Sequence, residues 1–258
     1  MADRHAAGTA RMSTGSPHST VDHSRRVVAL EGMHNVRDLG GLPVPAGTTR
    51  FGKVFRGDFP IALTGATSAA EAGLPIHSIV DLRRGSEAGR EQIDHESLGI
   101  RFTTSSLVTD HGTSWTATYY DYLVDGPDEI ILAVRTVMDD AENGVYFHCA
   151  AGKDRTGVIA ALLLDVLGVE HPLIVEDFLL TDVGIANILE RLRAVPGYEG
   201  VLAGRTLDQH RPQVAKIEAL LESLNEDWSG AEGWLLAHGL PLEVIERFRA
   251  LMIAPDPQ

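Results

Sequence analysis

The sequence of 258 residues is poor in several features, and each scarcity narrows the possible functions. It has a single cysteine, so no disulfide can form within the chain, which excludes a disulfide-stabilised extracellular domain. Positive charge is in deficit, because 22 Lys and Arg face 36 Asp and Glu, for a formal net charge of -14. Nonspecific binding to nucleic acid or to an anionic membrane needs the opposite balance, so we predict no nucleic-acid partner.

Long apolar runs are also missing. The longest, from Val158 to Val169, is too short to span a membrane and is interrupted by Asp165, so we predict no integral membrane association. The first 25 residues are rich in Ser, Thr, His, Gly and Arg and lack the apolar centre of a signal peptide. This composition predicts a disordered leader over residues 1–25. We therefore expect a cytoplasmic protein, or one exported without a conventional signal peptide.

Short β-favouring runs and helical patterns alternate in the first half of the chain. Strands are predicted at 27–30, 54–56, 78–83, 100–102 and 145–148, and a turn at 35–41. From Thr156 to Gly168 the chain has no polar face, which indicates a buried helix. Beyond Gly168 the pattern is nearly all helical. The sequence thus predicts an α/β fold in one domain, residues 26–258, with a helical elaboration at about 170–225.

A loop with the sequence HCAAGKDRTG, residues 148–157, lies between the last predicted strand and the buried helix. In such a loop the backbone N–H groups and the helix N-terminus point at one spot and attract an anion. Gly152 permits the backbone angles that a phosphate cradle needs. Arg155 can bind two phosphate oxygens with its rigid fork, and Lys153 adds a positive charge.

Cys149 occupies the one place in the chain where a thiolate would be stabilised. The positive field of the helix N-terminus, Arg155 and Lys153 favours the ionised sulfur, which is the nucleophilic form. A lone cysteine is more often a small buried apolar residue. The surrounding loop residues outweigh that interpretation here, so Cys149 is predicted to be a nucleophile.

The loop pattern HCxxGxxR[ST]G is that of cysteine-dependent phosphatases, and the fuller HCAAGKDRTG resembles a bacterial tyrosine/serine protein phosphatase family. The resemblance extends to NVRDLGG at 35–41, VFRGD at 54–58, IVDLR at 79–83, VEDFLL at 175–180 and the stretch 233–247, and so covers about residues 27–253. It implies a protein tyrosine phosphatase-like α/β fold, with a central sheet flanked by helices and a helical lid over the pocket. It also implies activity on phosphotyrosine, with phosphoserine, phosphothreonine and phosphoinositides as further substrates, so the partner is a phosphorylated protein or a phosphoinositide.

The predicted mechanism is attack of Cys149 on phosphorus, followed by hydrolysis of a phosphocysteine intermediate. Arg155 would stabilise the equatorial oxygens together with the backbone amides of the loop. Thr156 either donates a hydrogen bond to the sulfur or caps the following helix. His148 is expected to orient the loop rather than to transfer protons. The predicted phosphate-binding residues are Ala150, Ala151, Gly152, Lys153, Asp154 and Arg155.

A general acid must protonate the leaving oxygen, and an aspartate usually does so. The sequence contains no WPD motif, which carries this aspartate in many tyrosine phosphatases. Asp154 is the favoured candidate, although it could instead pair with Arg155 or with loop amides. Asp81 is the second candidate, because it lies at the exit of a predicted strand. Asp58 and Asp110 are weaker candidates that fit turns better.

Two other functions stay open on the residues alone. A noncatalytic phosphate-binding pseudophosphatase is disfavoured by the intact pair Cys149 and Arg155, and a rhodanese-like sulfurtransferase is disfavoured by His148 and by Gly152-Lys153. Lys153 fits either one phosphate or the additional phosphates of a phosphoinositide. The histidines show no metal-ligand spacing, so we predict neither a metal nor a cofactor.

Overall fold

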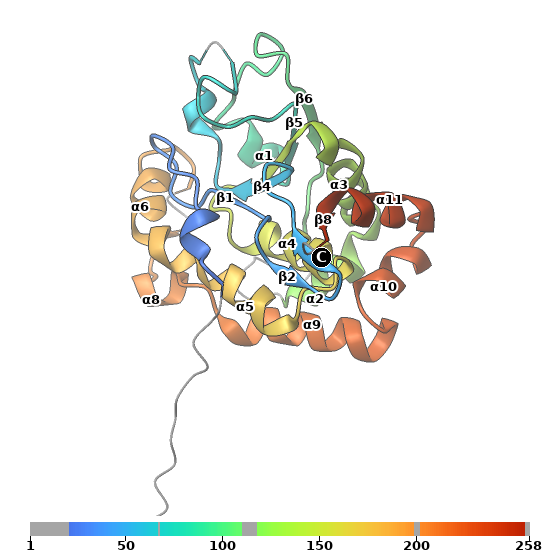
Figure 1. The fold of residues 1–258 in the computed structure, drawn as a ribbon. Coiled ribbons are helices and arrows are strands. Elements are labelled where there is room, and N and C mark those ends of the chain that lie inside the picture. The colour runs from blue at the N-terminus through green and yellow to red at the C-terminus, as the bar shows by residue number, and fades with distance from the viewer. Residues whose placement is uncertain (1–20, 67, 110–117, 199–201, 256–258) are drawn as a thin grey trace, which may run out of the picture.

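A five-stranded sheet organises the computed structural model, which describes residues 21–66, 68–109, 118–198 and 202–255 (Figure 1). The strand order is β1 (Arg37–Asp38), β4 (Val54–Gly57), β7 (Val145–His148), β5 (Ser78–Asp81) and β6 (Arg101–Thr104). The last four strands are parallel, and β1 pairs with β4 in the antiparallel sense. The strands predicted at 54–56, 78–83, 100–102 and 145–148 are thus confirmed to within one or two residues at their ends, and β7 lies at the centre of the sheet.

The N-terminal prediction was wrong in one respect. The run 27–30 forms only isolated bridges, whereas Arg37 and Asp38, in the segment predicted as a turn, form β1. A second, three-stranded sheet was not predicted. It joins β2 (Pro43–Val44), β3 (Gly47–Thr49) and β8 (Ile253–Ala254), and so ties the end of the described chain to its beginning.

Helices form most of the remaining structure. They are α1 (Gly85–Ala88), α2 (Tyr119–Asp125), α3 (Pro127–Asp140), α4 (Asp154–Val166), α5 (His171–Leu179), α6 (Thr181–Arg193), α8 (Leu207–His210), α9 (Val214–Trp228), α10 (Ala231–Ala237) and α11 (Leu242–Met252). The described residues also form the 3-10 helices η1 (His23–Arg25), η2 (Ile61–Leu63) and η3 (Ala141–Asn143). The helices predicted after Gly168 are confirmed in kind, whereas α2 was not predicted. α3 begins at a proline followed by two acids, as the preferences of a helix N-terminus require.

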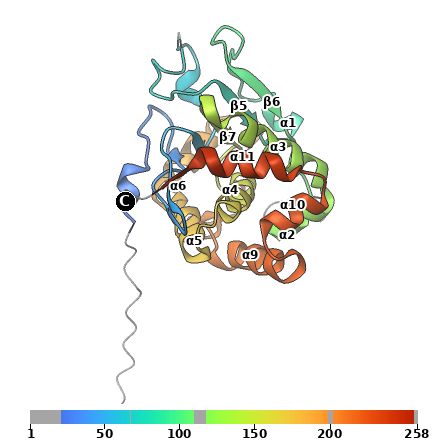
Figure 2. The same cartoon turned by 45° about the vertical axis from the view of Figure 1, so that its right-hand side comes forward.

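The buried helix predicted after the loop is α4, and Figures 1 and 2 both place it in the middle of the helices. Its residues from Val158 to Leu164 are each at most 1% exposed. Val54, Val80 and Phe147 of the sheet pack in the same apolar cluster as α3 and α4. Intervening residues such as Tyr146 face a second cluster on the other side of the sheet. Cores on both faces hold β7 and α4 in place, and these two elements carry the loop between them.

The predicted leader lies mostly outside the described residues. Its last part is described, however, because His23–Arg25 form η1 and His23 contacts Glu176. The folded part therefore begins before residue 26. Within the described ranges, none of the helices combines the length and the apolar character needed to cross a bilayer.

Candidate active site

The loop 149–153 leaves the carboxyl end of the central strand β7 and enters α4, at the edge of the sheet where α/β proteins bind ligands. Gly152 has φ +67°, and a Cβ there would lie 2.3 Å from the backbone carbon of Gly57. Only glycine fits this position without displacing β4, which confirms the geometric reason for a glycine in the loop.

Three successive carbonyl groups of the loop accept hydrogen bonds from side chains outside it. The pairs are Arg191 Nη2 to Ala150 O at 2.8 Å, Asn35 Nδ2 to Ala151 O at 2.9 Å and Arg56 Nη2 to Gly152 O at 3.0 Å. Among the described residues, none accepts a hydrogen bond from the backbone N–H groups of Ala150, Ala151 and Gly152. With the carbonyl groups turned outward, the N–H groups are left for the opposite side of the loop, which is the arrangement of an anion-binding nest.

The loop forms the floor of a pocket of about 220 Å³, and Cys149 lies on that floor with 3% of its surface exposed. The charged side chains that line the pocket are Arg84, Lys153, Arg155 and Arg205, with Glu87 and Asp154. Four cations therefore face two carboxylates in a chain whose formal net charge is -14. Positive charge is concentrated at this pocket, as the binding of a phosphate requires.

Arg155 is held by Glu87 of α1. Its Nη1 and Nη2 donate to the two carboxylate oxygens of Glu87 at 2.7 and 2.9 Å, and Nη1 also reaches Leu82 O at 3.3 Å. Burial raises the pKa of Glu87, but the charge of Arg155 and the hydrogen bonds from Arg155 and Arg84 together outweigh burial and lower this pKa to about 2. No described acceptor takes the Nε–H of Arg155. The edge formed by Nε–H and the second N–H of Nη2 is therefore available for a bidentate anion.

Asp154 is the first residue of α4 and lines the same pocket. Its Oδ1 accepts a hydrogen bond of 2.6 Å from the hydroxyl of Tyr119 in α2, and Lys153 Nζ lies 3.6 Å from the same oxygen. Tyr119 is 2% exposed, and burial together with the charge of Asp154 raises the pKa of this phenol well above its ordinary value. Tyr119 therefore stays a donor and orients the carboxyl group.

Lys153 is more constrained than its position in a loop suggests. Only 4% of it is exposed, and its Nζ donates to the carbonyl of His210 in α8 at 2.8 Å. The ammonium group thus joins the loop to the helical elaboration while it lines the pocket. His210 lines the pocket too, and burial, followed by the charge of Lys153, lowers the pKa of its imidazole.

The roof of the pocket is apolar and comes from the helical elaboration. α6 contributes Ile185, Leu189 and Leu192, and the chain beyond it contributes Tyr198 and Leu202. These residues form a cluster of their own with Ala150, separate from the main core. Within the helical part predicted at about 170–225, α6 and the described residues shortly after it line the pocket above the loop, whereas α5 and α9 pack in the main core.

Comparisons with known proteins identify the family of this chain. Residues 28–254 match the tyrosine phosphatase family. The chain belongs to that family. Among its relatives, a tyrosine-protein phosphatase of Nostoc commune is 27% identical over 213 residues, which cover 72% of this chain and 69% of the relative. The triple specificity protein phosphatase PtpB of Mycobacterium tuberculosis is 22% identical over 274 residues, covering 87% of this chain and 98% of PtpB. A solved structure of a Pseudomonas aeruginosa TpbA variant in complex with pTyr covers 73% of this chain and 100% of its own, at 14% identity and a TM-score of 0.39.

The other aspartates considered as the acid, where the structure describes them, do not line this pocket. Asp81 is fully buried and accepts three hydrogen bonds from the Arg83 guanidinium at 2.8 to 3.1 Å. Burial raises the pKa of Asp81, but the charges of His148 and Arg83 and the hydrogen bonds from Arg83 lower it overall. Asp58 is also buried and accepts the backbone N–H groups of residues 34 and 35. Asp110 lies outside the described residues.

His148 and Thr156 flank the loop. The Nδ1–H of His148 donates to the carbonyl of Cys149 at 3.1 Å, and burial lowers the pKa of the imidazole to about 4. Thr156 is buried, and its hydroxyl makes no hydrogen bond to any described residue, the sulfur of Cys149 included. Lys153, not Thr156, is the N-cap residue of α4. Neither of the two contacts expected for Thr156 is present in this state.

Sequence reasoning missed several residues of the pocket. Arg84, Glu87, Arg205 and His210 line the pocket, and Tyr119 binds the pocket residue Asp154 from outside the pocket. Each is distant from the loop along the chain, and no motif distinguishes it from a surface residue of the same type. Over the described ranges, no three His, Cys, Asp or Glu side chains form a group able to hold a metal ion.

Proposed function

We propose that this phosphatase hydrolyses phosphotyrosine, and further phosphoserine, phosphothreonine and phosphoinositide monoesters, through a phosphocysteine intermediate on Cys149. The observation that carries the proposal is the shared floor of one pocket. Cys149 and Arg155 both line this pocket. The carbonyl groups of the loop residues between them are turned outward, which leaves the N–H groups of those residues for the pocket side. A thiolate, a guanidinium and a nest of N–H groups are the three parts that transfer of a phosphoryl group to sulfur needs.

In the first step the thiolate of Cys149 attacks phosphorus in line with the leaving oxygen. The S–P bond forms as the P–O bond breaks, and Asp154 gives its proton to the leaving phenolate or alkoxide. The loop N–H groups and the free edge of Arg155 stabilise the charge on the three equatorial oxygens. Tyr119 holds the carboxyl group of Asp154 at the pocket, which supports Asp154 over Asp81 as the acid.

In the second step water attacks the phosphorus of the phosphocysteine. Asp154, now a carboxylate, takes a proton from this water, the S–P bond breaks, and the sulfur leaves as a thiolate. Inorganic phosphate is released and the enzyme returns to its starting state. Glu87 keeps the Arg155 fork aligned through both steps, since it binds the edge of the guanidinium that faces away from the substrate.

The pocket walls support a range of substrates. The apolar roof offers a surface for the phenyl ring of phosphotyrosine, and the cations Arg84, Lys153 and Arg205 offer charge for additional phosphates of a phosphoinositide. The relative PtpB is named a triple specificity protein phosphatase, which supports more than one class of substrate. Rates on a phosphotyrosine peptide, a phosphoserine peptide and a phosphoinositide, measured side by side, rank these substrates.

Cys149→Ser tests the nucleophile. We expect the wild type to hydrolyse p-nitrophenyl phosphate and to be inhibited by vanadate, and the variant to show no turnover while still binding a phosphotyrosine peptide. A rapidly quenched reaction of the wild type should trap phosphate on Cys149, detected by mass spectrometry. Turnover retained by the variant would remove Cys149 as nucleophile, an inactive wild type would favour the pseudophosphatase, and transfer of sulfur from thiosulfate to cyanide would favour the sulfurtransferase.

A further inference from the structure

Asp177 of α5 is a buried charge that the proposed mechanism does not use. It is 1% exposed and does not line the pocket. Its carboxylate accepts hydrogen bonds from Arg26 at 2.6 Å, Arg37 at 3.0 Å and Arg56 at 2.6 Å, and each of these arginines is at most 1% exposed. Burial raises the pKa of Asp177, but the charges of Arg37, Arg56 and Arg26 outweigh it and lower this pKa. Three buried cations thus share one carboxylate.

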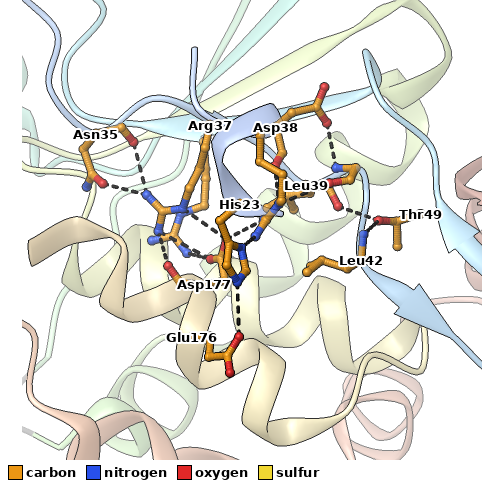
Figure 3. A network of polar contacts seen from close by, with 12 residues as sticks. His23, Asn35, Arg37, Asp38, Leu39, Leu42, Thr49, Glu176 and Asp177 are labelled. Atoms are coloured by element: carbon orange, nitrogen blue, oxygen red, sulfur yellow. Dashed lines mark hydrogen bonds and ion pairs between the residues drawn. The ribbon is translucent and has the colours of Figure 1, made fainter. Parts of the chain in front are cut away.

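Two of these three arginines reach the phosphate loop. Arg56 uses the other nitrogen of its fork to bind the Gly152 carbonyl at 3.0 Å. Arg37 donates to Oδ1 of Asn35 at 2.6 Å, and Nδ2 of Asn35 binds the Ala151 carbonyl at 2.9 Å. Figure 3 shows Arg37 lying between Asn35 and Asp177. Two connected chains of hydrogen bonds therefore run from Asp177 to adjacent carbonyl groups of the loop.

The third arginine does not reach the loop. Arg26 donates its Nε–H to the carbonyl groups of Asp38 and Gly40, which lie in and just after β1. Arg26 and Arg56 thus have nearly the same burial and the same distance of 2.6 Å to Asp177, and differ in whether they also touch the loop. Arg26 is therefore a matched control for Arg56.

A buried arginine that binds a carboxylate with one nitrogen and a carbonyl with another has a fixed orientation, because the guanidinium is planar and rigid. Removal of either partner would leave a buried charge or a buried carbonyl unsatisfied, which is costly. The outward position of the Gly152 and Ala151 carbonyls is therefore set by a network whose centre lies on α5, outside the pocket.

We infer that Asp177 is the centre of a positioning network in which Arg56 and Asn35 hold the loop carbonyls outward, so that the loop N–H groups converge on the phosphoryl group. This inference rests on the proposed function and adds a role for residues that touch neither substrate nor sulfur. Because an error of about 1 Å in a catalytic group can cost about a hundred-fold in rate, small shifts of the loop should be visible in kinetics.

Arg56→Lys and Arg26→Lys form the test pair. Each keeps the positive charge near Asp177, but a single ammonium cannot replace the fork that joins Asp177 to Gly152. We expect Arg56→Lys to lower kcat/KM for p-nitrophenyl phosphate by about ten- to a hundred-fold, and to raise the Ki of vanadate at least about ten-fold. Arg26→Lys should lower the unfolding midpoint to a similar extent but change both constants less than about two-fold, since it touches no loop atom.

Asn35→Ala gives a second measurement that removes no charge. It deletes the donor to the Ala151 carbonyl and should weaken vanadate inhibition in the same direction, which keeps the test available if Arg56→Lys does not fold. If the wild type is active but the Ki of vanadate is the same for Arg56→Lys, Asn35→Ala and Arg26→Lys, this inference is overturned and the proposed function stands. A wild type without turnover would overturn both.

Discussion

The floor and the roof of the pocket are built by opposite means. The floor is a backbone loop whose carbonyl groups are bound by buried Asn and Arg side chains, and whose arginine is bound by a buried glutamate. The roof is a patch of α6 and the residues after it, whose pocket-facing side chains form a small apolar cluster. Among the described residues of α6, only Arg191, near its end, joins this helix to the loop through a hydrogen bond. Charged hydrogen bonds have strict geometry, whereas apolar contacts are nondirectional.

This difference separates two tasks. The floor must hold one constant group, the phosphoryl, in one geometry, and its many directional bonds serve that purpose. The roof meets the variable part of the substrate, the leaving group. Changes in the floor should therefore lower kcat for every substrate, whereas changes in the roof should alter KM in a way that depends on the substrate.

The strongest test of this contrast replaces the fork in the floor. Arg155→Lys keeps the positive charge, but a lysine has one nitrogen. It cannot bind both oxygens of Glu87 and at the same time present a second pair of N–H groups to a phosphate. We expect kcat/KM to fall about 10³-fold on every phosphomonoester, because the equatorial oxygens lose their bidentate partner in the transition state. Arg84→Lys is the control, since Arg84 lines the same pocket but is exposed. It should cost less than about ten-fold, and a similar loss in both variants would contradict a special role for the fork.

The acid is the next test, and its effect should depend on the leaving group. Asp154→Asn should lower kcat about a hundred-fold on phosphotyrosine peptide or an alkyl phosphate, whose leaving oxygens need a proton. The leaving group of p-nitrophenyl phosphate, p-nitrophenolate, is a stable anion that needs no proton, so kcat on this substrate should fall much less. An equal loss on all of these substrates would remove Asp154 as the acid and make Asp81→Asn the variant to measure.

Tyr119→Phe sharpens the same point, because it deletes only the hydroxyl that orients Asp154. We expect a loss in the same substrate order as Asp154→Asn but smaller. Tyr120→Phe is a close control. The hydroxyl of Tyr120 bonds Asp227 and receives the indole N–H of Trp228, so its removal should leave the ranking of substrates unchanged. If the two variants behave alike, the hydrogen bond to Asp154 has no catalytic effect.

The burial of the floor also predicts how stability depends on pH. Burial lowers the pKa of His148 from 6.5 to about 4, so the unfolded chain binds this proton before the folded protein does. The contribution to stability is complete above pH 6.5 and is lost as the pH falls from there through about 4, amounting to about 3 kcal/mol. His148→Asn keeps a donor for the Cys149 carbonyl and should flatten urea unfolding free energies over this window. A slope that survives the substitution would belong to other groups.

The part of the floor that could be predicted from the sequence is the part whose residues follow one another in a single short segment. Cys149, Arg155 and the glycine between them lie within one short segment that joins a strand to a helix, so motif and local structure support each other. Glu87 could not be found in this way. It precedes Arg155 by 68 positions and reaches it because the parallel strands β5 and β7 place their carboxyl ends side by side.

The network behind the floor shows the same limit. Arg37 and Arg56 both form buried ion pairs with Asp177, which lies 140 and 121 positions away along the chain. Arg37 even forms part of a strand where the sequence predicted a turn. β-propensity does not favour an Arg-Asp pair, and here the tertiary contacts of the buried guanidinium outweigh local preference.

The roof offers the smallest effect and the clearest contrast with the floor. Leu189 of α6 is 3% exposed and lines the pocket, whereas Val183 on the same helix is 89% exposed. Leu189→Ala should raise KM for phosphotyrosine peptide by up to about ten-fold, since it removes apolar area that the phenyl ring would bury. Vanadate is expected to contact only the floor, so its Ki should change little in Leu189→Ala, and kcat should also change little. Val183→Ala should leave KM, kcat and the Ki of vanadate unchanged. If Leu189→Ala instead weakens vanadate as much as peptide, the roof also shapes the loop, and the division between a directional floor and an adaptable roof does not hold.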